Sequence, residues 1–380
     1  MIFDYEMLKL IWWILIGVLL IGFAVTDGFD MGGLAILPLV AKTDDERRVV
    51  INTMAPHWDG NQVWFITAGG ALFAAWPLVY AAAFSGLYWA MLLVLFAMFL
   101  RPVGFDYRSK MQDQRWRDAW DWALVVGGAV PALVFGIAFG NLLQGVPFQY
   151  DELIRPSYHG SFFALLNPFA LLCGIVSLSM LCLHGATWVQ MRTHEAVEAR
   201  SRLYARIFAL ICFITFALAG LWLTVGIEGY QIVYMPATDA VSNPTLKEVV
   251  RAEGAWLGNY VNYPVTMIAP ALGFIGLIGA YLFASAHKAA LAFLFSALGI
   301  TGIILTAGIS MFPFVMPSSL VPNHSLTLWD AASGAYTLMV MTWAAIIFVP
   351  IILGYTFWCY RALWSKIGVS FIKENNHSLY

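Results

Sequence analysis

Long apolar stretches, separated by short polar segments, run along the whole chain. Nine of them are close to the length of about 20 mostly apolar residues that a membrane-spanning helix needs. They cover residues 9–29, 50–76, 78–100, 120–142, 164–189, 204–226, 262–284, 289–311 and 335–361. This pattern predicts an all-α integral membrane protein with about nine transmembrane helices arranged in helical bundles.

The basic residues favour counting all nine stretches, including the irregular one at 50–76. With nine helices, the 20 Lys and Arg residues divide very unevenly between the two sides of the membrane. The poorer side receives only Lys9, Arg155, Lys247 and Arg251. Cytoplasmic loops carry the excess of Lys and Arg, so we expect a periplasmic amino terminus and a cytoplasmic carboxyl terminus. Leaving out 50–76 would place the basic loops 42–48 and 101–117 on opposite sides and destroy the asymmetry.

Composition agrees with a membrane protein and argues against several other classes. Charged residues make up 11% of the chain and hydrophobic residues 61%, whereas soluble domains carry roughly 25% charged residues. The net charge of −2 offers no basic surface for nucleic acid. The four cysteines form no CxxC pair, so the sequence predicts neither a disulfide framework nor a thiolate metal site. We expect one transmembrane domain over residues 1–380, in which 227–261 is the longest periplasmic loop.

Asp59 is the clearest candidate for a functional residue, because a carboxyl group at bilayer depth is energetically costly. It lies about nine residues into the predicted helix 50–76, or about 14 Å along it, so we expect it near the midplane. A charge there costs about 2.5–3.5 kcal/mol on insertion scales and should face protein or water. Asp59 belongs either to a proton relay or polar cofactor contact, or to a buried network that fixes packing.

Helical spacing divides the polar residues around Asp59 between two faces. His57 and Asn61 are four residues apart and share a face that Trp64 continues, whereas Asp59 lies on a different face. For His57 the functional and the packing interpretations both stay open, and for Asn61 the pattern favours a structural role. Pro56 removes one helical hydrogen bond, so we expect this helix at a seam between proteins with some internal water.

Three further carboxyl groups are candidates for a proton path. Asp27 and Asp30 lie three residues apart at the predicted cytoplasmic end of the first helix, where the macrodipole disfavours negative charge and favours proton uptake. Interfacial solvation is the alternative for both. Asp106 follows Arg101 at the cytoplasmic end of the third helix, where a membrane anchor with its counter-ion is the simpler interpretation. Together with Asp59, these groups outline a path inward from the cytoplasm.

Two smaller features bear on packing and on cofactors. The glycine pairs at 69–70 and 127–128 predict close approach between helices. His184, near the inner end of the helix 164–189, has the chemistry of an axial haem ligand, but a hydrogen-bonded interfacial histidine is more common. The sequence contains no GxxxxGK[ST] loop and no HExxH motif, which argues against a P-loop nucleotide site and a zinc protease.

Several long motifs are distributed from the first helix to the end of the chain. They are GFDMG at 28–32, APHWDGNQVW at 55–64, GGALFAAWP at 69–77, RPVGFDYR at 101–108, FGNLLQGVP at 139–147, FPFVMPSS at 312–319 and HSLY at 377–380. Together they resemble subunit II of the cytochrome bd-type quinol oxidases. Motifs of this length and number make a chance match very improbable.

The resemblance implies a heterodimeric oxidoreductase of the bacterial inner membrane, in which this chain joins a homologous larger subunit I. Such a complex oxidises quinol and reduces oxygen to water in aerobic respiration. Haem b and haem d belong to the larger subunit, so we expect this chain to bind no metal and not to be catalytic alone. The resemblance also places Asp59 and Asp106 in a route that takes up protons from the cytoplasm.

Further components follow from the same resemblance. Some members are reported to hold a structural ubiquinone, which we place near Trp58, Asn61 and Arg101. Small accessory subunits and phospholipid are additional candidate partners.

Two alternative functions remain when the residues are considered alone. A secondary transporter would account for Asp59 and for the irregular helix 50–76, although no inverted repeat is evident. A purely structural subunit would account for everything except an acidic residue at bilayer depth.

Overall fold

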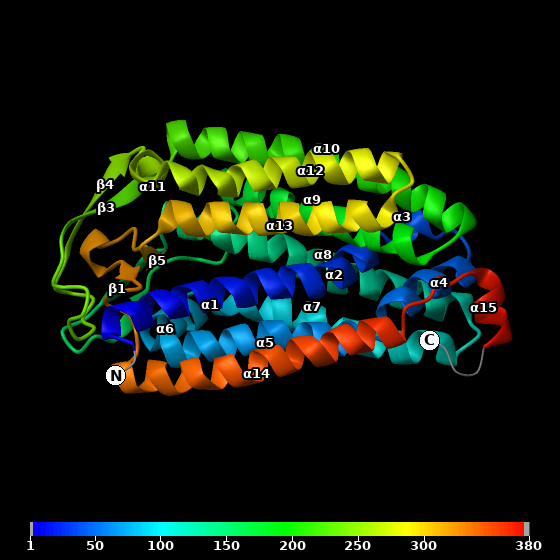
Figure 1. Ribbon diagram of the computed structural model, residues 1–380, viewed down its shortest axis with the longest axis horizontal. Helices are drawn as coiled ribbons and strands as arrows, with labels where there is room; N and C mark the ends of the chain where they lie inside the picture. The colour runs from blue at the N-terminus through cyan, green and yellow to red at the C-terminus, as the bar shows by residue number, and fades with distance from the viewer. Residues whose placement is uncertain (1–2, 376–379) are drawn as a thin grey trace.

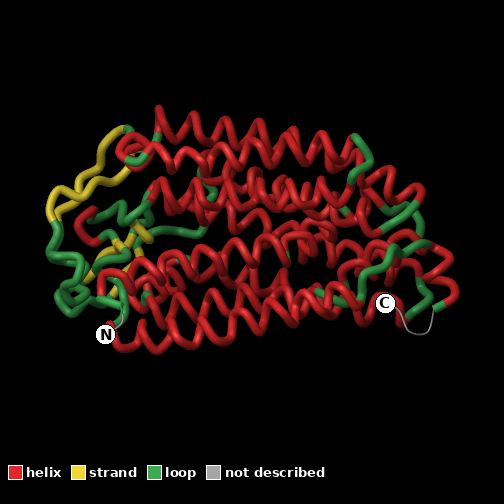
Figure 2. Tube along the Cα trace, in the orientation of Figure 1, coloured by secondary structure: helices red, strands yellow, loops and turns green. Residues whose placement is uncertain are grey.

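The computed structural model describes residues 3–375 and residue 380. Most of the chain is helical, and the helices run nearly parallel to the long axis, as Figure 1 shows. Figure 2 shows that the strands and many of the loops gather at the end that contains the N-terminus. His377, Ser378 and Leu379 of the terminal motif lie outside the described residues. The architecture confirms the predicted all-α membrane fold.

Eight helical segments of the described chain are long and apolar enough to cross a membrane. In chain order they are α1 (Tyr5–Thr26) with α2 (Gly28–Ala35), α7 (Tyr88–Tyr107) with the 3₁₀ turn η1 (Arg108–Lys110), α8 (Gln114–Gln144), α9 (Pro168–Arg192), α10 (Glu195–Gly226), η4 (Pro264–Met267) with α12 (Ile268–Ser285), α13 (Ala289–Met311) and α14 (Ala335–Ala362). α5 (Trp58–Ala75) meets the same criteria only together with α6 (Pro77–Gly86), from which a bend of 120° separates it, and this pair makes a ninth crossing if it is counted as one span. The two termini lie at opposite ends of the bundle in Figure 1, as an odd number of crossings requires.

The predicted second helix, 50–76, is wrong as one continuous helix. α4 (Asp44–Met54) ends before Pro56, a turn follows, and α5 begins at Trp58. Trp188 of α9 donates its indole N–H to the carbonyl of Thr53 (3.2 Å), one of the carbonyls that the end of α4 leaves without a helical partner. Asp59 therefore lies in the first turn of α5 and not nine residues inside a helix, so its expected midplane position is wrong.

The predicted third helix, 78–100, is also divided. α6 starts with Pro77 at its first position, where the missing N–H costs nothing, and α7 starts after Leu87 and continues to Tyr107. The ring of Tyr158 packs against Gly86 at the end of α6, where a Cβ atom would come within 2.5 Å of that ring. A residue of β2 (Pro156–Tyr158) thus occupies the corner between the two helices.

The core forms where α2 lies between α8 and α9 with almost no side chain in between. A Cβ atom on Gly32 of α2 would lie 1.7 Å from the Leu181 carbonyl oxygen of α9, and one on Gly128 of α8 would lie 2.3 Å from the Met31 carbonyl oxygen. The close approach predicted for the second glycine pair is therefore confirmed at Gly128. At the pair 69–70, a Cβ atom on either glycine would meet nothing within 4 Å, so the described chain makes no close helix approach there.

Short elements close the two ends of the bundle. At the N-terminal end, three antiparallel pairs form from β1 (Phe148–Tyr150) and β2 (Pro156–Tyr158), β3 (Glu228–Tyr234) and β4 (Glu248–Glu253), and β5 (Phe314–Met316) and β6 (Leu326–Thr327). The remaining short helices are α3 (Leu37–Val40), η2 (Phe163–Leu165), η3 (Ala255–Leu257), α11 (Gly258–Asn262), η5 (Pro322–His324) and α15 (Val369–Glu374). The segment 227–261 contains β3, β4 and η3 and is thus partly structured.

Ion pairs tie the helices together at the C-terminal end. Arg108 contacts Asp44 of α4 (2.8 Å) and Asp121 of α8 (2.5 Å). Arg47 of α4 contacts Asp121 (2.7 Å) and Asp118 (2.9 Å). Because Arg108 and Asp121 are both nearly inaccessible to solvent, this network holds α4, α7 and α8 in a fixed arrangement at the end where α5 begins.

Candidate functional site

The polar residues at the start of α5 lie on two opposite sides of the helix, as the spacing predicts. His57, Asn61 and Trp64 are buried against the chain, with exposed fractions of 6%, 2% and 9%. Asp59 is exposed. Successive residues of a helix are turned by about 100°, so Asp59 and Asn61, two positions apart, point to nearly opposite sides of α5. The predicted division into two faces is confirmed.

A chain of side-chain hydrogen bonds begins at the buried face of α5. The Asn61 amide donates to Asp30 Oδ2 (2.7 Å), and the hydroxyl of Tyr360 on α14 donates to Asn61 Oδ1 (2.6 Å). The His57 ring stacks on the Tyr360 ring, with centroids 4.5 Å apart and planes inclined by 7°. The amide of Asn61, at the start of α5, thus joins α14 to the α1–α2 segment.

Asp27 and Arg101 form the other half of this buried cluster. The Arg101 guanidinium donates to both Asp27 carboxylate oxygens, with Nη1 at 2.8 Å from Oδ2 and Nη2 bonded to Oδ1. Both side chains, and that of Asp30, are 0% exposed. Two buried polar atoms in the cluster have no hydrogen-bond partner, namely Asp30 Oδ1 and Arg101 Nε.

The surroundings of Asp27 and Asp30 differ from those expected at a helix end. The spanning segment does not stop near residue 29 but continues through α2 to Ala35, with only a turn at Asp27. Both carboxyl groups therefore lie inside the span and are held by Arg101 and Asn61. A guanidinium and an amide take the place of the solvent that the interfacial alternative required.

Asp59 and Asp106 lie on the outer surface of the chain, apart from the buried cluster. Asp106 occupies the last turn of α7 and is exposed, like Asp59 at the start of α5. Their neighbours in sequence bring the two turns together, because the rings of Trp58 and Phe105 have centroids 6.1 Å apart. The four predicted carboxyl groups thus form two sets, one outward and one inward, rather than one line.

The predicted quinone contacts are only partly accessible. The polar atoms of Asn61 are bonded to Asp30 and Tyr360, and Arg101 is bonded to Asp27. Trp58 is partly exposed, so it is the one of the three predicted residues with a free surface.

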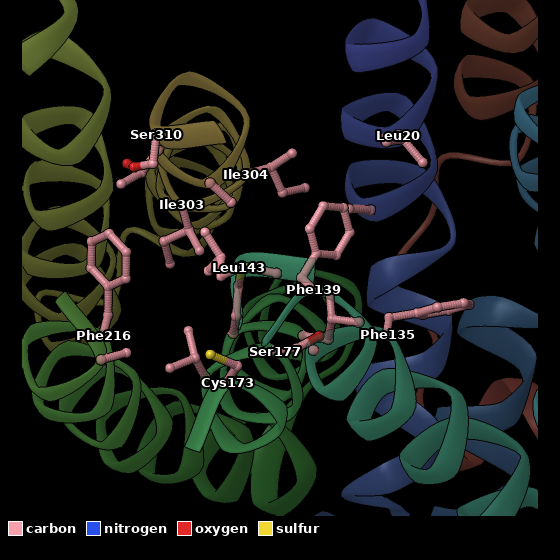
Figure 3. A pocket seen from close by; sticks show the side chains of 18 of the residues that line it. Leu20, Phe135, Phe139, Leu143, Cys173, Ser177, Phe216, Ile303, Ile304 and Ser310 are labelled. Atoms are coloured by element: carbon pink, nitrogen blue, oxygen red, sulfur yellow. The ribbon is translucent and has the colours of Figure 1, made fainter. Parts of the chain in front are cut away.

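A separate apolar cavity opens between α1, α8, α9, α10 and α13, and Figure 3 shows its lining from close by. It contains about 1160 Å³ of empty space, including the part that opens to the surroundings. The lining includes Phe135, Phe139, Phe216 and Ile303, and its hydroxyl groups are those of Ser177, Thr306 and Ser310. Such a lining suits a hydrocarbon chain and offers little to a charged group.

His184, the candidate for an axial haem ligand, is engaged within the chain. Among the residues that the structure describes, no three His, Cys, Asp or Glu side chains gather closely enough to hold a metal ion. The His184 ring is buried with Nδ1 bonded to Ser296 Oγ (2.7 Å) and Nε2 to the Val25 carbonyl (2.9 Å), so neither nitrogen is free for iron. Val25 precedes the turn at Asp27, and His184 thus satisfies a carbonyl near the helix break.

Tyr360 is the member of the site that sequence reasoning missed. It lies 299 residues after Asn61, near the end of an apolar helix that contains several other aromatic residues. Its one distinguishing feature is the partner of its hydroxyl group, which only the folded chain supplies.

Comparisons with known proteins agree with the fold and indicate the family. The family model for cytochrome bd terminal oxidase subunit II matches residues 8–363. Cytochrome bd-I ubiquinol oxidase subunit 2 of Escherichia coli (strain K12) is 58% identical, over 99% of this chain and 100% of the relative. The probable cytochrome oxidase subunit 2 of Haemophilus influenzae is 54% identical over 99% of this chain and 100% of its own length.

A more distant relative and a solved structure extend the comparison. The cytochrome bd ubiquinol oxidase subunit 2 of Bacillus subtilis is 33% identical over 94% of this chain and 96% of the relative. The structure of bd oxidase from Geobacillus thermodenitrificans matches with a TM-score of 0.69 at 14% identity, covering 94% of this chain and 98% of that one, and so supports the fold. The chain belongs to the family of cytochrome bd terminal oxidase subunit II, which forms part of a haem-containing oxidoreductase complex in the bacterial inner membrane together with a subunit I.

Proposed function

We propose that this chain is the haem-free subunit of a ubiquinol oxidase and that it supplies a scaffold and a proton-uptake path to subunit I. The relatives from Escherichia coli and Bacillus subtilis are ubiquinol oxidase subunits by name, which supports ubiquinol as the electron donor. In this proposal subunit I holds the b and d haems and reduces oxygen to water. Both ring nitrogens of His184 are hydrogen-bonded within this chain, which supports the assignment of the haems to subunit I.

The position of Asp59 carries the proposal for proton uptake. It is exposed at the start of a spanning helix, on a surface stripe that continues through Val63, Ile66, Gly70 and Phe73. A carboxyl group on such a surface is costly against lipid, and it becomes favourable where a second protein and some water cover it. The open glycine on the same stripe supports close contact with another helix. We infer that subunit I covers this stripe and that Asp59 lies in the seam.

Proton entry would begin beside Asp106, whose turn lies next to that of Asp59. The ion-pair network of Arg47, Arg108 and Asp121 marks this end of the bundle as the one rich in basic residues, which supports a cytoplasmic orientation. The amino terminus would then be periplasmic. In the proposed route Asp106 and Asp59 pass protons along the seam.

Asp27, Asp30 and His57 form the inner part of the proposal. They lie on the other side of α5 and would respond to the charge that accumulates during turnover. Small accessory subunits and phospholipid remain proposed partners on surfaces of this chain that face lipid.

The substitution Asp59→Asn tests the seam route against a purely structural role. The amide keeps the size of the side chain but does not release a proton at neutral pH, so ubiquinol-driven oxygen consumption by the purified complex should fall by about tenfold or more. Haem content, read from the visible spectrum, should stay unchanged. Glu228→Asn, at an exposed acidic residue of β3 at the other end, is the control and should leave turnover unchanged. Full activity of the Asp59→Asn complex would leave the structural role as the better explanation.

We also propose that the apolar cavity accommodates the tail of a structural ubiquinone. The predicted headgroup contacts at Asn61 and Arg101 are engaged within the chain, whereas the cavity offers a predominantly hydrocarbon lining. Ala307→Phe would place a ring in this space, so the ubiquinone extracted per haem should decrease. An unchanged ratio would place the quinone elsewhere.

A further inference from the structure

The buried cluster around Asp30 contains one more negative group than positive groups. Asp27, Asp30 and Arg101 are all completely buried, and Arg101 is the only cation within ion-pair distance of either carboxyl group in the described part of the chain. A net charge without solvent is strongly unfavourable in such a place. One bound proton would make the cluster neutral.

The hydrogen bonds indicate which carboxyl group takes that proton. Asp27 accepts from Arg101 at both oxygens, an arrangement that suits an ionised carboxylate. Asp30 accepts a single bond, from Asn61 to Oδ2, and its Oδ1 has no partner. Leaving a charged oxygen without a donor costs more than leaving a neutral one, so the proton belongs on Oδ1 of Asp30.

We propose that Asp30 is a neutral carboxylic acid in the resting complex and that Tyr360, acting through Asn61, is the positioning residue that sets how firmly Asp30 holds its proton. The inference rests on the proposed function only where it assigns this proton a role in proton uptake. The charge count and the hydrogen bonds stand independently of turnover.

The coupling follows from the way hydrogen bonds polarise one another. The Tyr360 hydroxyl donates to Asn61 Oδ1 (2.6 Å), which withdraws electron density from the amide and strengthens its N–H donation to Asp30 Oδ2 (2.7 Å). Arg101 and Asp27 are the charged groups beside Asp30. His57 stacks on Tyr360, and Arg192 is a cation near both rings.

The position of Tyr360 gives the cluster a connection to the outside of the chain. Only 11% of the apolar window of α14 is buried in this chain, so most of the helix surface is left for lipid or another protein. Near its end, however, Arg192 donates to the carbonyls of Leu363 (2.7 Å) and Ser365 (2.8 Å) and holds the segment in place. A small displacement of α14 relative to α5 would change the hydrogen bond from the Tyr360 hydroxyl to Asn61. Through Asn61 it would also change the hydrogen bond to Asp30 and so the hold on the proton of Asp30.

Infrared spectroscopy of the purified oxidase complex, with each variant compared with the unaltered complex, tests the proposal directly. A protonated carboxyl group has a C=O stretching band apart from the amide and carboxylate bands, and Asp30→Asn should abolish one such band. Tyr360→Phe should move the same band to higher frequency, because the carbonyl then accepts a weaker hydrogen bond. Tyr355→Phe, on the same helix but 65% exposed, is the matched control and should leave the band in place.

The possible outcomes separate the parts of the proposal. A spectrum that Asp30→Asn leaves unchanged would overturn the protonated carboxyl group. A band that disappears in Asp30→Asn but does not move in Tyr360→Phe would overturn the role of Tyr360. If Tyr360→Phe fails to assemble, as judged by haem content, Asn61→Ala should produce the same upward shift, and its failure to do so overturns the coupling. Normal oxygen consumption in Asp59→Asn would refute the seam route and leave these bands unaffected.

Discussion

The substitution Arg101→Met provides the most quantitative check on the buried cluster. It keeps much of the volume of the side chain but removes the donors from both Asp27 oxygens. Asp27 must then stay charged without a partner or take up a proton. Protonating an ordinary carboxyl group at pH 7 costs about 4 kcal/mol, because its pKa is about 3.9 and each pH unit corresponds to about 1.4 kcal/mol. This value falls within the roughly 3–5 kcal/mol that breaking a buried ion pair typically costs.

The same reasoning makes the loss dependent on pH. Neutralising an unpaired carboxylate costs less at lower pH, so the Arg101→Met chain should lose less stability at pH 5 than at pH 7. The measurement is the free energy of unfolding of the purified complex in mixed micelles, followed by circular dichroism at both pH values. The double variant Asp27→Asn, Arg101→Met should regain most of the stability and lose this pH dependence. A deficit of the same size at both pH values, or none at all, would refute the assignment of a charged Asp27.

Two further predictions concern the helix core and the loops. Gly32→Ala should cost at least about 1–3 kcal/mol and lower the yield of haem-containing complex, because the new Cβ atom would lie 1.7 Å from the Leu181 carbonyl oxygen. Gly17→Ala, with no neighbour within 4 Å, should be neutral or slightly stabilising, and equal yields of the two would contradict the close approach. Burial lowers the pKa of His324, whose Nδ1 accepts the Tyr150 N–H (3.0 Å). Between that lowered value and about 6.5 the unfolded chain binds more protons, so the midpoint of thermal unfolding should fall as the pH decreases through about 6.5. His324→Gln should flatten this profile, and an unchanged slope would exclude the histidine as its source.

Hydrophobic length was sufficient for most of the spanning helices, whereas the distribution of basic residues was needed to count the segment 50–76 as well. The sequence was not sufficient for the break before α5. Pro56 requires that some carbonyls lose their helical partners, but a kink and a complete interruption are both consistent with that requirement. The interruption is stabilised by Trp188, whose indole bonds to the Thr53 carbonyl from 135 residues away. The depth of Asp59 depended on this tertiary contact and was therefore predicted wrongly.

The buried partners were unpredictable for a related reason. Period and spacing place Asn61 on the inner face of α5 and Asp59 on the outer one, and the structure confirms this. They do not indicate what the inner face meets. Arg101 is 74 residues from Asp27, and Tyr360 is 299 residues from Asn61, so these pairs arise from the packing of whole helices.

The division of the carboxyl groups by α5 has a consequence for how protons can move. Asp59 and Asn61 are two residues, or about 3 Å, apart along the helix axis, yet they point in nearly opposite directions across a helix about 10–12 Å wide. The outer group of Asp59 thus lies at about the same height as Asp30, with the backbone of α5 and the Asn61 side chain between them. An amide offers a proton at one end and an acceptor at the other but does not release a proton at neutral pH. Protons on the outer path would therefore influence Asp30 through the electric field and through small movements of α5 or α14, and not by direct transfer across the helix.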